Sequence, residues 1–147
     1  MVIRFAEKRD VEQIVVLCQE HAAYESATCE TENHRERLSK HLFGKSPGAQ
    51  CLVVEADGWV VGYATFMKQF STWDADHYLY LDCLYLQEAA RGQGGGLKVM
   101  EKIREYAIGE NCRAVQWQTP AYNKAAIRFY RRMGARSTAK ERFFWLL

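Results

Sequence analysis

The sequence predicts an α/β fold in which one mixed, mostly antiparallel sheet is flanked by helices, and two patterns lead to this prediction. Residues 50–66 hold two β-rich runs on either side of Asp57-Gly58, the two-residue signal of a tight hairpin, so neighbouring antiparallel strands are expected there. Residues 78–119 instead read as strand, helix and strand, and such a crossover joins parallel strands. A hairpin and a crossover in one chain together give a mixed sheet.

The first third of the chain reads as one strand and two helices. Residues 2–6 alternate between apolar and polar side chains, as a half-buried strand does. Asp10 is suited to cap the following helix, whose apolar positions recur at helical spacing as far as about Tyr24-Glu25. Residues 26–33 are polar and aperiodic, which indicates a loop, and a second helix is expected over 35–43.

The rest of the chain alternates between strand and helix patterns. Aromatic and aliphatic residues dominate 78–86, as in a strand covered on both faces, and apolar residues recur every three or four positions over 97–107, as in an amphipathic helix. The elements expected after residue 48 are strands at 50–56, 59–66 and 78–86, a connection at 68–77, a helix at 97–107, a strand at 114–119, a helix at 123–134 and a last strand at 142–147.

Composition and charge exclude several classes of protein. The length of 147 residues fits a single domain, here residues 1–147. Twenty basic and eighteen acidic side chains leave a formal charge of +2, which gives no electrostatic case for a nucleic-acid partner. No apolar run approaches the ~20 residues that cross a bilayer. The five cysteines are widely spaced and lack a Cys-x-x-Cys pair, so a cytoplasmic protein without a metal site is expected.

The stretch from Arg91 to Gly96 is the strongest candidate for a binding site, because four of its six residues are glycines between a predicted strand and a predicted helix. Glycines let the backbone approach a ligand closely, and a helix start adds free N–H groups and a positive dipole end. A turn that only ends the strand is the competing interpretation. A phosphate loop of the Walker type is excluded because Leu97 and Lys98 follow the glycines, and Leu97 also replaces the third glycine of a dinucleotide fingerprint.

The pattern Arg-x-x-Gly-x-Gly at this junction resembles the motif Gln/Arg-x-x-Gly-x-Gly/Ala of the GNAT acyltransferases, with Arg91, Gly94 and Gly96 at the fixed positions. The order of predicted elements also matches that family over nearly the whole chain. The resemblance implies that acetyl-coenzyme A is the cosubstrate and that the backbone amides from about Gly92 to Leu97 hold its pyrophosphate. The cofactor-binding residues implied in this way are Leu84, Leu86, Arg91, Gly92, Gln93, Gly94, Gly95, Gly96, Leu97, Asn123, Phe129 and Tyr130.

A second motif follows about thirty residues later. Asn123-x-x-Ala126-x-x-Phe129-Tyr130 ends at Gly134-Ala135 and resembles the second cofactor motif of the superfamily. Within the superfamily, the spermidine/spermine acetyltransferase branch is the most similar, on account of Ala22-Ala23-Tyr24-Glu25, Leu42-Phe43-Gly44 and Tyr80-Leu81-Asp82. That branch usually has a glutamate and a second acid where this chain has Asp82 and Cys83, which weakens the polyamine assignment.

Two residues are the candidates for acid and base chemistry. By resemblance, the Tyr130 hydroxyl protonates or hydrogen-bonds the departing thiolate, whereas helix packing is its alternative role. Asn123 caps the following helix or also contacts the pantetheine arm. A protonated amine with a pKa near ~10 cannot attack a thioester, and Asp82 is the candidate that accepts its proton, directly or through a water. A structural hydrogen bond is the competing role of Asp82.

The predicted function is acetyl transfer to a primary amine of a small cationic molecule, without a covalent enzyme intermediate. Polyamines and diamines come first, followed by aminoglycosides, amino acids and protein amines, and the alternative is a coenzyme-A-binding regulatory module. The candidate substrate-binding residues are Tyr24, Glu25, Trp73, Asp74 and Asp82, although acids in such loops also serve as plain solvated surface. The apolar end Phe143–Leu147 predicts a homodimer in which a second subunit covers a terminal edge strand, unless alternate side chains face the chain's own core.

Overall fold

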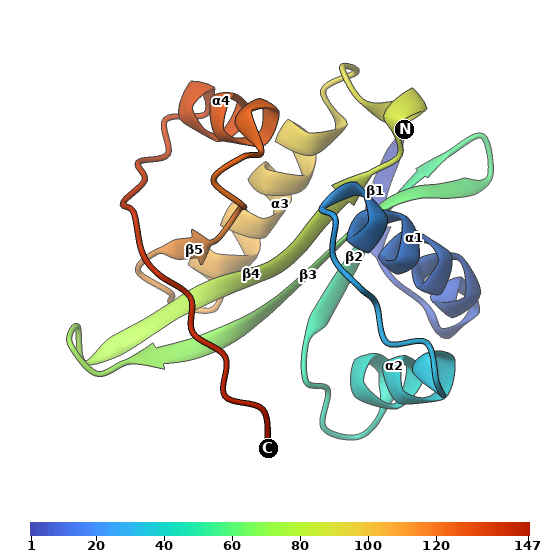
Figure 1. Cartoon of the computed structure of the whole chain (residues 1–147), viewed down its shortest axis with the longest axis horizontal. Helices are drawn as coiled ribbons and strands as arrows, with labels where there is room; N and C mark the ends of the chain where they lie inside the picture. Colours follow the sequence, from blue (N-terminus) through green and yellow to red (C-terminus); the bar gives the residue numbers. More distant parts are fainter.

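The computed structural model describes residues 1–147 and contains one five-stranded sheet with helices on both faces (Figure 1). The strands lie side by side in chain order, from β1 to β5. Each of the first three pairs antiparallel with the next, whereas β4 and β5 pair in parallel, which confirms the mixed, mostly antiparallel sheet. The strand bounds are β1 Val2–Phe5, β2 Gln50–Ala56, β3 Trp59–Ser71, β4 Asp76–Leu86 and β5 Val115–Trp117.

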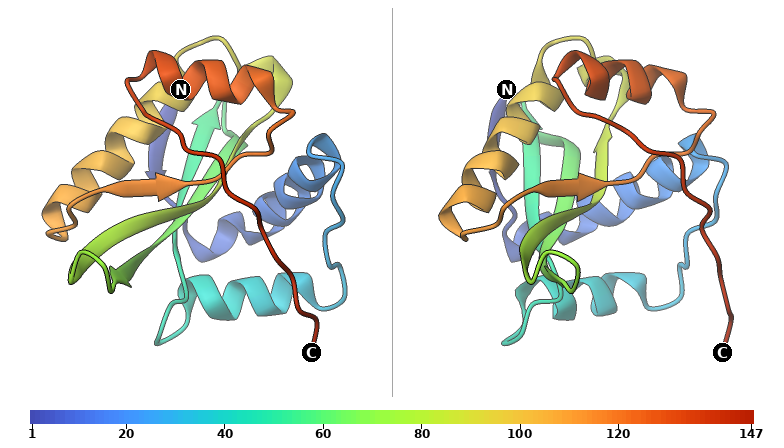
Figure 2. Two further views of the ribbon diagram at one scale, coloured as in Figure 1. Left: turned by 60° about the vertical axis from the view of Figure 1, so that its left-hand side comes forward. Right: turned by 90° about the vertical axis from the view of Figure 1, so that its left-hand side faces the viewer.

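Four α-helices cover the sheet, two on each face (Figures 1 and 2). Helices α1 (Val11–Tyr24) and α2 (His34–Phe43) lie on one side, and α3 (Gly95–Gly109) and α4 (Lys124–Arg132) lie on the other. Single-turn 3₁₀ helices precede α1 at Lys8–Asp10 and α3 at Glu88–Ala90. The sequence analysis predicted all four helices, with ends that differ by a few residues.

Strand β2 shows how the sheet divides the core into two clusters. Leu52 and Val54 pack on the α3 side with Phe66 and Ile103, whereas Cys51 and Val53 pack on the α1 side. This alternation follows from the two-residue period of a strand. Both faces of β2 are buried, so the sheet is held from both sides and provides a rigid support for the loops at its edges.

Two predicted segments are wrong. Residues 68–77 are no simple connection, because β3 and β4 pair as far as Ser71 and Asp76 and leave only residues 72–75 as a turn. The apolar Phe66 and Met67 are followed by alternating exposed residues that continue the ladder, a pattern typical of a sheet that extends beyond its helices. Residues 142–147 form no strand, since they make no ladder with the sheet. The hairpin at Asp57-Gly58 is confirmed, with φ of 51° and 80°.

Asp10 occupies the predicted position before α1, but its carboxylate does not cap that helix. It stands at the N-cap of α1, yet its carboxylate makes no bond to that helix. Instead it accepts hydrogen bonds from the Arg4 guanidinium at 2.7 and 3.0 Å and from the Glu7 backbone N–H at 2.7 Å. These bonds, led by that of Arg4, lower the pKa of the Asp10 carboxyl against the opposing effect of burial. The residue therefore ties β1 to the start of α1.

The central feature for function is the end of β4. The β4–β5 ladder stops at Leu81 and Trp117, while β4 continues to Leu86. At the same point the β3–β4 register shifts, with Thr65 opposite Cys83 and Phe66 opposite Leu81, so that Asp82 is the extra residue of a bulge. The edge of β4 from residue 82 onward is therefore open toward β5 and α4.

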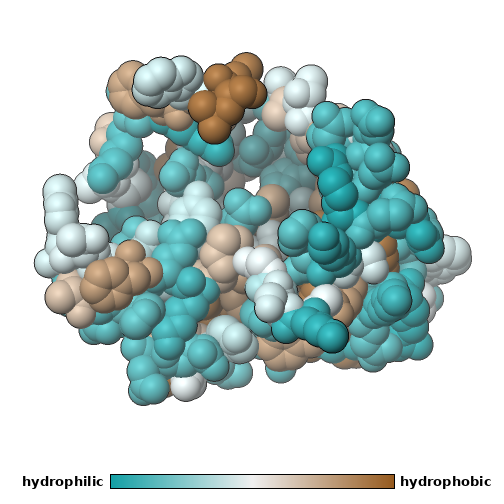
Figure 3. Space-filling view, turned by 90° about the horizontal axis from the view of Figure 1, so that it is seen from below, coloured by the Kyte–Doolittle hydropathy of each residue, from teal (hydrophilic) through white to brown (hydrophobic).

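The C-terminal segment, residues 135–147, leaves α4 and runs across the front of the sheet to the lower edge of the molecule (Figures 1 and 2). Its last five residues are all exposed, Trp145 to 92%. Viewed from this end, the molecule is mostly hydrophilic, with a hydrophobic projection at its margin (Figure 3). No helix combines the length and the apolar character that a bilayer crossing requires.

Candidate active site

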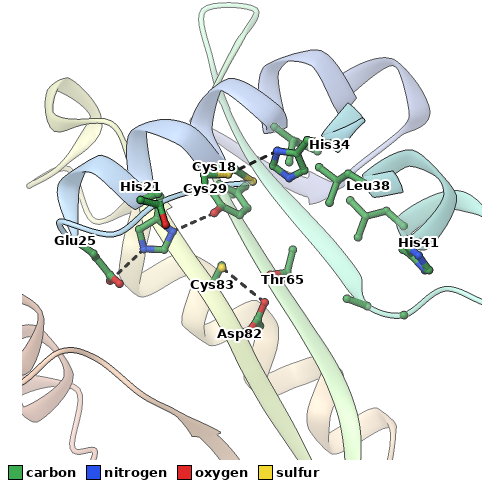
Figure 4. Close-up of a pocket in the computed structure, with 17 residues that line it drawn as sticks. Cys18, His21, Glu25, Cys29, His34, Leu38, His41, Thr65, Asp82 and Cys83 are labelled. Atoms are coloured by element: carbon green, nitrogen blue, oxygen red, sulfur yellow. Dashed lines mark hydrogen bonds and ion pairs between the residues drawn. The ribbon is translucent and has the colours of Figure 1, made fainter. Parts of the chain in front are cut away.

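Two cavities meet at the bulge of β4. The larger one, here called the long groove, has a volume of about 1090 Å³ and lies between β4, the glycine-rich loop at 91–96 and α4. The smaller one, here called the side pocket, has a volume of about 420 Å³ and lies under α1 and α2 (Figure 4). Four residues line both cavities, namely His21, Glu25, Asp82 and Cys83. A ligand in one cavity can therefore contact a ligand in the other at this junction.

The glycine-rich loop gives one end of the long groove the properties of an anion site. Gly92 and Gly94 have φ of 75° and 79°, values that strain any residue with a side chain. The first α3 hydrogen bond that involves this loop runs from the Lys98 N–H to the Gly94 carbonyl. The amides of residues 95–97 thus stand in the first turn, where a helix has no internal acceptors and a positive dipole end. The prediction of an anion cradle agrees with this geometry.

Arg91 supports the loop from behind. Its Nε donates to the Leu86 carbonyl at 2.8 Å, and its guanidinium lies over the Tyr24 ring at 4.4 Å and the Tyr85 ring at 5.5 Å. Leu86 is the last residue of β4, so this bond holds the strand end against the start of the loop. Arg91 also lines the long groove, and apart from the Nε bond its guanidinium contacts the faces of these two rings.

Helix α4 forms the opposite wall of the long groove. Asn123 accepts a hydrogen bond from the Ala126 N–H at 3.2 Å, which confirms its capping role. A Cβ on Gly96 would stand 3.3 Å from the Phe129 ring, so the bare glycine lets α4 approach the cradle. Trp117 and Phe129 lie with ring centroids 5.1 and 5.2 Å from Tyr130. These contacts fix Tyr130 at the wall of the groove.

The Tyr130 hydroxyl is kept protonated by its surroundings. Burial, and to a smaller extent the negative charge of Glu25, raise the pKa of Tyr130 to about 12. Both effects disfavour the phenolate, so the hydroxyl remains a hydrogen-bond donor throughout the neutral range. Tyr130 and Glu25 both line the long groove.

Asp82 lies among apolar residues in the sequence, yet it is not buried in the structure. The bulge turns it outward, and the residue is exposed. Its one hydrogen-bond partner in the protein is the Cys83 thiol, which donates to Oδ2 at 3.7 Å. An exposed carboxylate with one weak donor keeps most of its lone pairs for a ligand or for water.

The side pocket is built from side chains that lie far apart in the sequence. Helix α1, helix α2, β3 and β4 all contribute, and Figure 4 shows His21 and Glu25 on α1 facing Asp82 and Cys83 across the cavity. His21 Nδ1 lies 3.0 Å from the Tyr63 hydroxyl, and His21 Nε2 lies 3.2 Å from Glu25 Oε1. Sequence reasoning missed His21 and Tyr63. The only available signal was a polar residue on each of two otherwise apolar faces.

Most of the predicted cofactor and substrate residues come together in the structure, and three do not. Gln93 lines neither cavity, since its side chain turns back to the Ala89 carbonyl. Trp73 and Asp74 lie in the turn between β3 and β4 and line neither cavity, and Trp73 is 95% exposed. This turn is remote from the cavities because the two strands extend beyond their predicted ends. The predicted residues that line the long groove are Tyr24, Glu25, Asp82, Leu84, Leu86, Arg91, Gly92, Gly94, Gly95, Gly96, Leu97, Asn123, Phe129 and Tyr130.

Further cations border the long groove. Arg132 on α4 lines it, and the C-terminal segment adds Lys140 and Arg142, which sequence reasoning did not include. These groups give the groove the positive charge that suits a polyanionic ligand. No lysine or arginine lines the side pocket, whose charged groups are carboxylates and histidines. The structure contains no group of three or more His, Cys, Asp or Glu side chains arranged around a metal position.

Comparison with known proteins gives a consistent picture. Residues 9–135 match the model of the acetyltransferase (GNAT) family. The thialysine N-epsilon-acetyltransferase of Bos taurus is 33% identical in an alignment of 143 residues, and the match covers 92% of this chain and 84% of that protein. The spermidine/spermine N(1)-acetyltransferase-like protein 1 of Homo sapiens is 28% identical and aligns with 95% of this chain, although the match covers only 21% of its own length.

A solved structure shares the fold. An aminoglycoside acetyltransferase from an uncultured soil metagenomic sample, crystallised with sisomicin, superimposes with a TM-score of 0.82. The alignment covers 99% of this chain and 96% of that one at 16% sequence identity, so it bears on the architecture alone.

Proposed function

The chain belongs to the acetyltransferase (GNAT) family, and on that premise we propose that it moves acetyl from acetyl-coenzyme A to a primary amine of a small cationic acceptor. The observation that carries the proposal is the junction at Asp82, where an anion-binding groove and an acidic pocket meet. Such an arrangement brings a polyanionic donor and a cationic acceptor to one point from opposite sides.

The long groove fits the donor. The free amides of the glycine-rich loop suit a pyrophosphate, and the open edge of β4 over residues 82–86 offers backbone groups to an extended amide-containing arm. Leu84 and Leu86 stand on that edge and line the groove. Acetyl-coenzyme A supplies the activated acetyl group as a thioester.

The side pocket favours a cationic acceptor. Glu25 and Asp82 line it and no lysine or arginine opposes them, so an ammonium group finds compensation there and a carboxylate does not. On this ground polyamines and diamines rank first. Lysine-like amino acids such as the thialysine named for the bovine relative carry a carboxylate for which the pocket offers only histidines.

Asp82 and Tyr130 divide the proton chemistry. Asp82 takes a proton from the ammonium, directly or through a water, and so frees the nitrogen lone pair. The amine attacks the thioester carbonyl carbon; the C–N bond forms and the C–S bond breaks. The Tyr130 hydroxyl donates to the departing sulfur, a role that suits its raised pKa because the group stays protonated until that moment. The second proton, which the nitrogen loses as the amide forms, returns to the Tyr130 oxygen, and Asp82 releases its proton to solvent. The products are the acetamide and the free thiol.

A thiol-release assay with acetyl-coenzyme A tests the proposal against a panel of 1,4-diaminobutane, spermidine, thialysine and an aminoglycoside. We expect release with the diamine and spermidine, each giving a monoacetylated product by mass spectrometry. A protein that binds acetyl-coenzyme A in calorimetry but releases no thiol with any amine is the regulatory module instead.

A further inference from the structure

The side pocket contains a chain of three hydrogen-bonded groups that the proton chemistry above does not use. Tyr63 on β3, His21 on α1 and Glu25 at the end of α1 are joined by distances of 3.0 and 3.2 Å. The Tyr63 residue is 2% exposed, and the side chains of His21 and Glu25 are 14% and 30% exposed. A partly buried chain of this kind has few alternative partners, so its orientation is fixed by the groups themselves.

The chemistry of Glu25 determines the direction of the chain. An ionised carboxylate only accepts hydrogen bonds, so the proton of a neutral His21 ring must lie on Nε2, which donates to Glu25. Nδ1 then carries a lone pair and must accept from the Tyr63 hydroxyl. The Tyr63 hydrogen is thereby engaged, and its oxygen can only accept from other groups, which here are the nearby Cys18 and Cys83 thiols and any N–H group in the side pocket that Tyr63 lines.

Packing holds the imidazole in this position. The His21 ring stacks on the Tyr85 ring with centroids 5.2 Å apart and an interplanar angle of 19°, and it meets the Tyr63 ring edge-on at 6.0 Å. Tyr85 is itself held by its hydroxyl, which donates to Glu20. The ring therefore has little freedom to flip and exchange its two nitrogens.

From this arrangement we propose that His21 is a positioning residue for the acceptor amine. Through Glu25 it presents the Tyr63 oxygen to the side pocket as a hydrogen-bond acceptor for the N–H groups of a cationic acceptor. The inference rests on the proposed function, which supplies that acceptor, and assigns a role in binding the acceptor rather than in the chemical step. It adds a recognition group to the pocket that also contains Asp82.

Protonation of His21 reverses the hydrogen bond. Nδ1 then carries a proton and donates to the Tyr63 oxygen, so the Tyr63 hydrogen turns toward the pocket and meets the ammonium as a second donor. The acceptor amine, with a pKa near ~10, keeps its charge whether or not the imidazole is protonated. The KM for the acceptor should therefore rise as the pH falls.

Other titratable groups must be separated from His21 in the experiment. Those in contact with the ring are Tyr63, Tyr85 and Glu25, those across the cavity are Asp82 and Cys83, the Arg91 guanidinium lies over Tyr85, and His34 and His41 line the far part of the side pocket. The two further histidines line the same pocket and so need control variants.

The test compares three variants and two controls by their KM and kcat for 1,4-diaminobutane between pH 5 and pH 8. In His21→Gln, the amide N–H₂ can donate to Glu25 and the amide oxygen can accept from Tyr63, so we expect a KM near that of the parent at pH 8 that no longer rises in acid. His21→Leu and Tyr63→Phe should each raise this KM about tenfold, as for one lost hydrogen bond to a charged group, with a smaller change in kcat. His34→Gln and His41→Gln should retain the pH dependence.

A spectroscopic measurement tests the chain without turnover. Long-range ¹H–¹⁵N correlation of histidine-labelled protein should show His21 as the Nε2–H tautomer in the absence of substrates, with an Nδ1 shift that changes in Tyr63→Phe and not in the control Tyr78→Phe. An Nδ1–H tautomer, or a His21→Leu variant with the KM of the parent, overturns the inference. If no amine releases thiol, calorimetry of 1,4-diaminobutane with the same variants replaces KM, so the failure of the proposed function and the failure of this inference remain distinct.

Discussion

The long groove takes its strand edge and its anion-binding amides from the backbone of one continuous stretch, residues 82–97, and its opposite wall from α4, whereas the side pocket takes its groups from side chains on four separate elements. In the groove, the bulge at Asp82, the open edge of β4 and the glycines at 92 and 94 follow one another along the chain. In the pocket, His21 and Tyr63 come from a helix and a strand that meet only in the folded protein. A family can keep the first while changing the second, which separates the donor from the choice of acceptor.

The largest expected effect is a loss of affinity for acetyl-coenzyme A in the long groove, with the side pocket unchanged. Gly94→Glu places a negative side chain at a residue with φ of 79°, where it strains the loop and repels a pyrophosphate. A Cβ there meets no protein atom within 4 Å, so the fold itself has room. Calorimetry should show the affinity for acetyl-coenzyme A reduced by more than about 100-fold.

Gly109→Glu is the matched control, because Gly109 ends α3 in open space, with an ordinary backbone conformation, and lines neither cavity. It should bind acetyl-coenzyme A as the parent does. An unchanged affinity in Gly94→Glu would remove the anion site from the account.

The next effect lies on the groove side of the junction. Tyr130→Phe removes the hydroxyl but keeps the ring contacts to Trp117 and Phe129, so kcat should fall roughly 100-fold, the lower range for a lost general acid, while the affinity for acetyl-coenzyme A changes little. Tyr106→Phe provides the comparison, since Tyr106 packs on Phe66 away from both cavities. If Tyr130→Phe kept the kcat of the parent, the role of Tyr130 would be limited to helix packing.

A substitution of Asp82 tests the junction at which the long groove and the side pocket meet. Asp82→Asn should lower kcat about tenfold or more at neutral pH and recover part of it in alkali, where more of the amine is already deprotonated. Asp57→Asn, in the β2–β3 turn, is the control and should leave the pH–rate profile alone. If Asp82→Asn had the same profile as the parent, another group would have to accept the proton.

The smallest kinetic effect is expected at the C-terminal segment, which borders the groove alone. Its exposed apolar end predicts a dimer, so light scattering should give twice the chain mass of 17.0 kDa. Deletion of Phe143–Leu147 should restore the single-chain mass and change the KM for acetyl-coenzyme A only a few-fold, since Phe144 is the only deleted residue that lines the groove. A parent protein with a mass near 17.0 kDa contradicts the dimer.

The contrast between the regions also explains what could be predicted from the sequence. The hairpin at Asp57-Gly58 and the loop at 91–96 depend on local backbone conformation, which glycines mark in the sequence, and both were predicted correctly. The side pocket depends on which face of α1 meets which face of β3, and nothing in the sequence around His21 or Tyr63 indicates that contact. Trp73 and Asp74 were misplaced because the ends of β3 and β4 are set by their mutual pairing.

The prediction of a strand in the C-terminal segment was wrong for a related reason. Residues 142–147 have the composition of a strand, but β-propensity describes a fit to a neighbouring surface and needs a partner strand. Within one chain, no strand pairs with them. The sequence places Asp82 in an apolar strand but does not indicate the bulge that turns it outward, because the bulge arises from the register between β3 and β4.

The central claim is that the groove and the pocket open onto one reacting centre, and one conjugate tests it directly. Coenzyme A joined through its sulfur by an acetyl bridge to one nitrogen of 1,4-diaminobutane should occupy both cavities at once. We predict that calorimetry shows it binding at least about 100-fold more tightly than coenzyme A, with that advantage reduced in Tyr63→Phe, because the second portion binds at high effective concentration. A conjugate that binds no better than coenzyme A would show that the acceptor does not enter the side pocket from the groove, and would contradict the account.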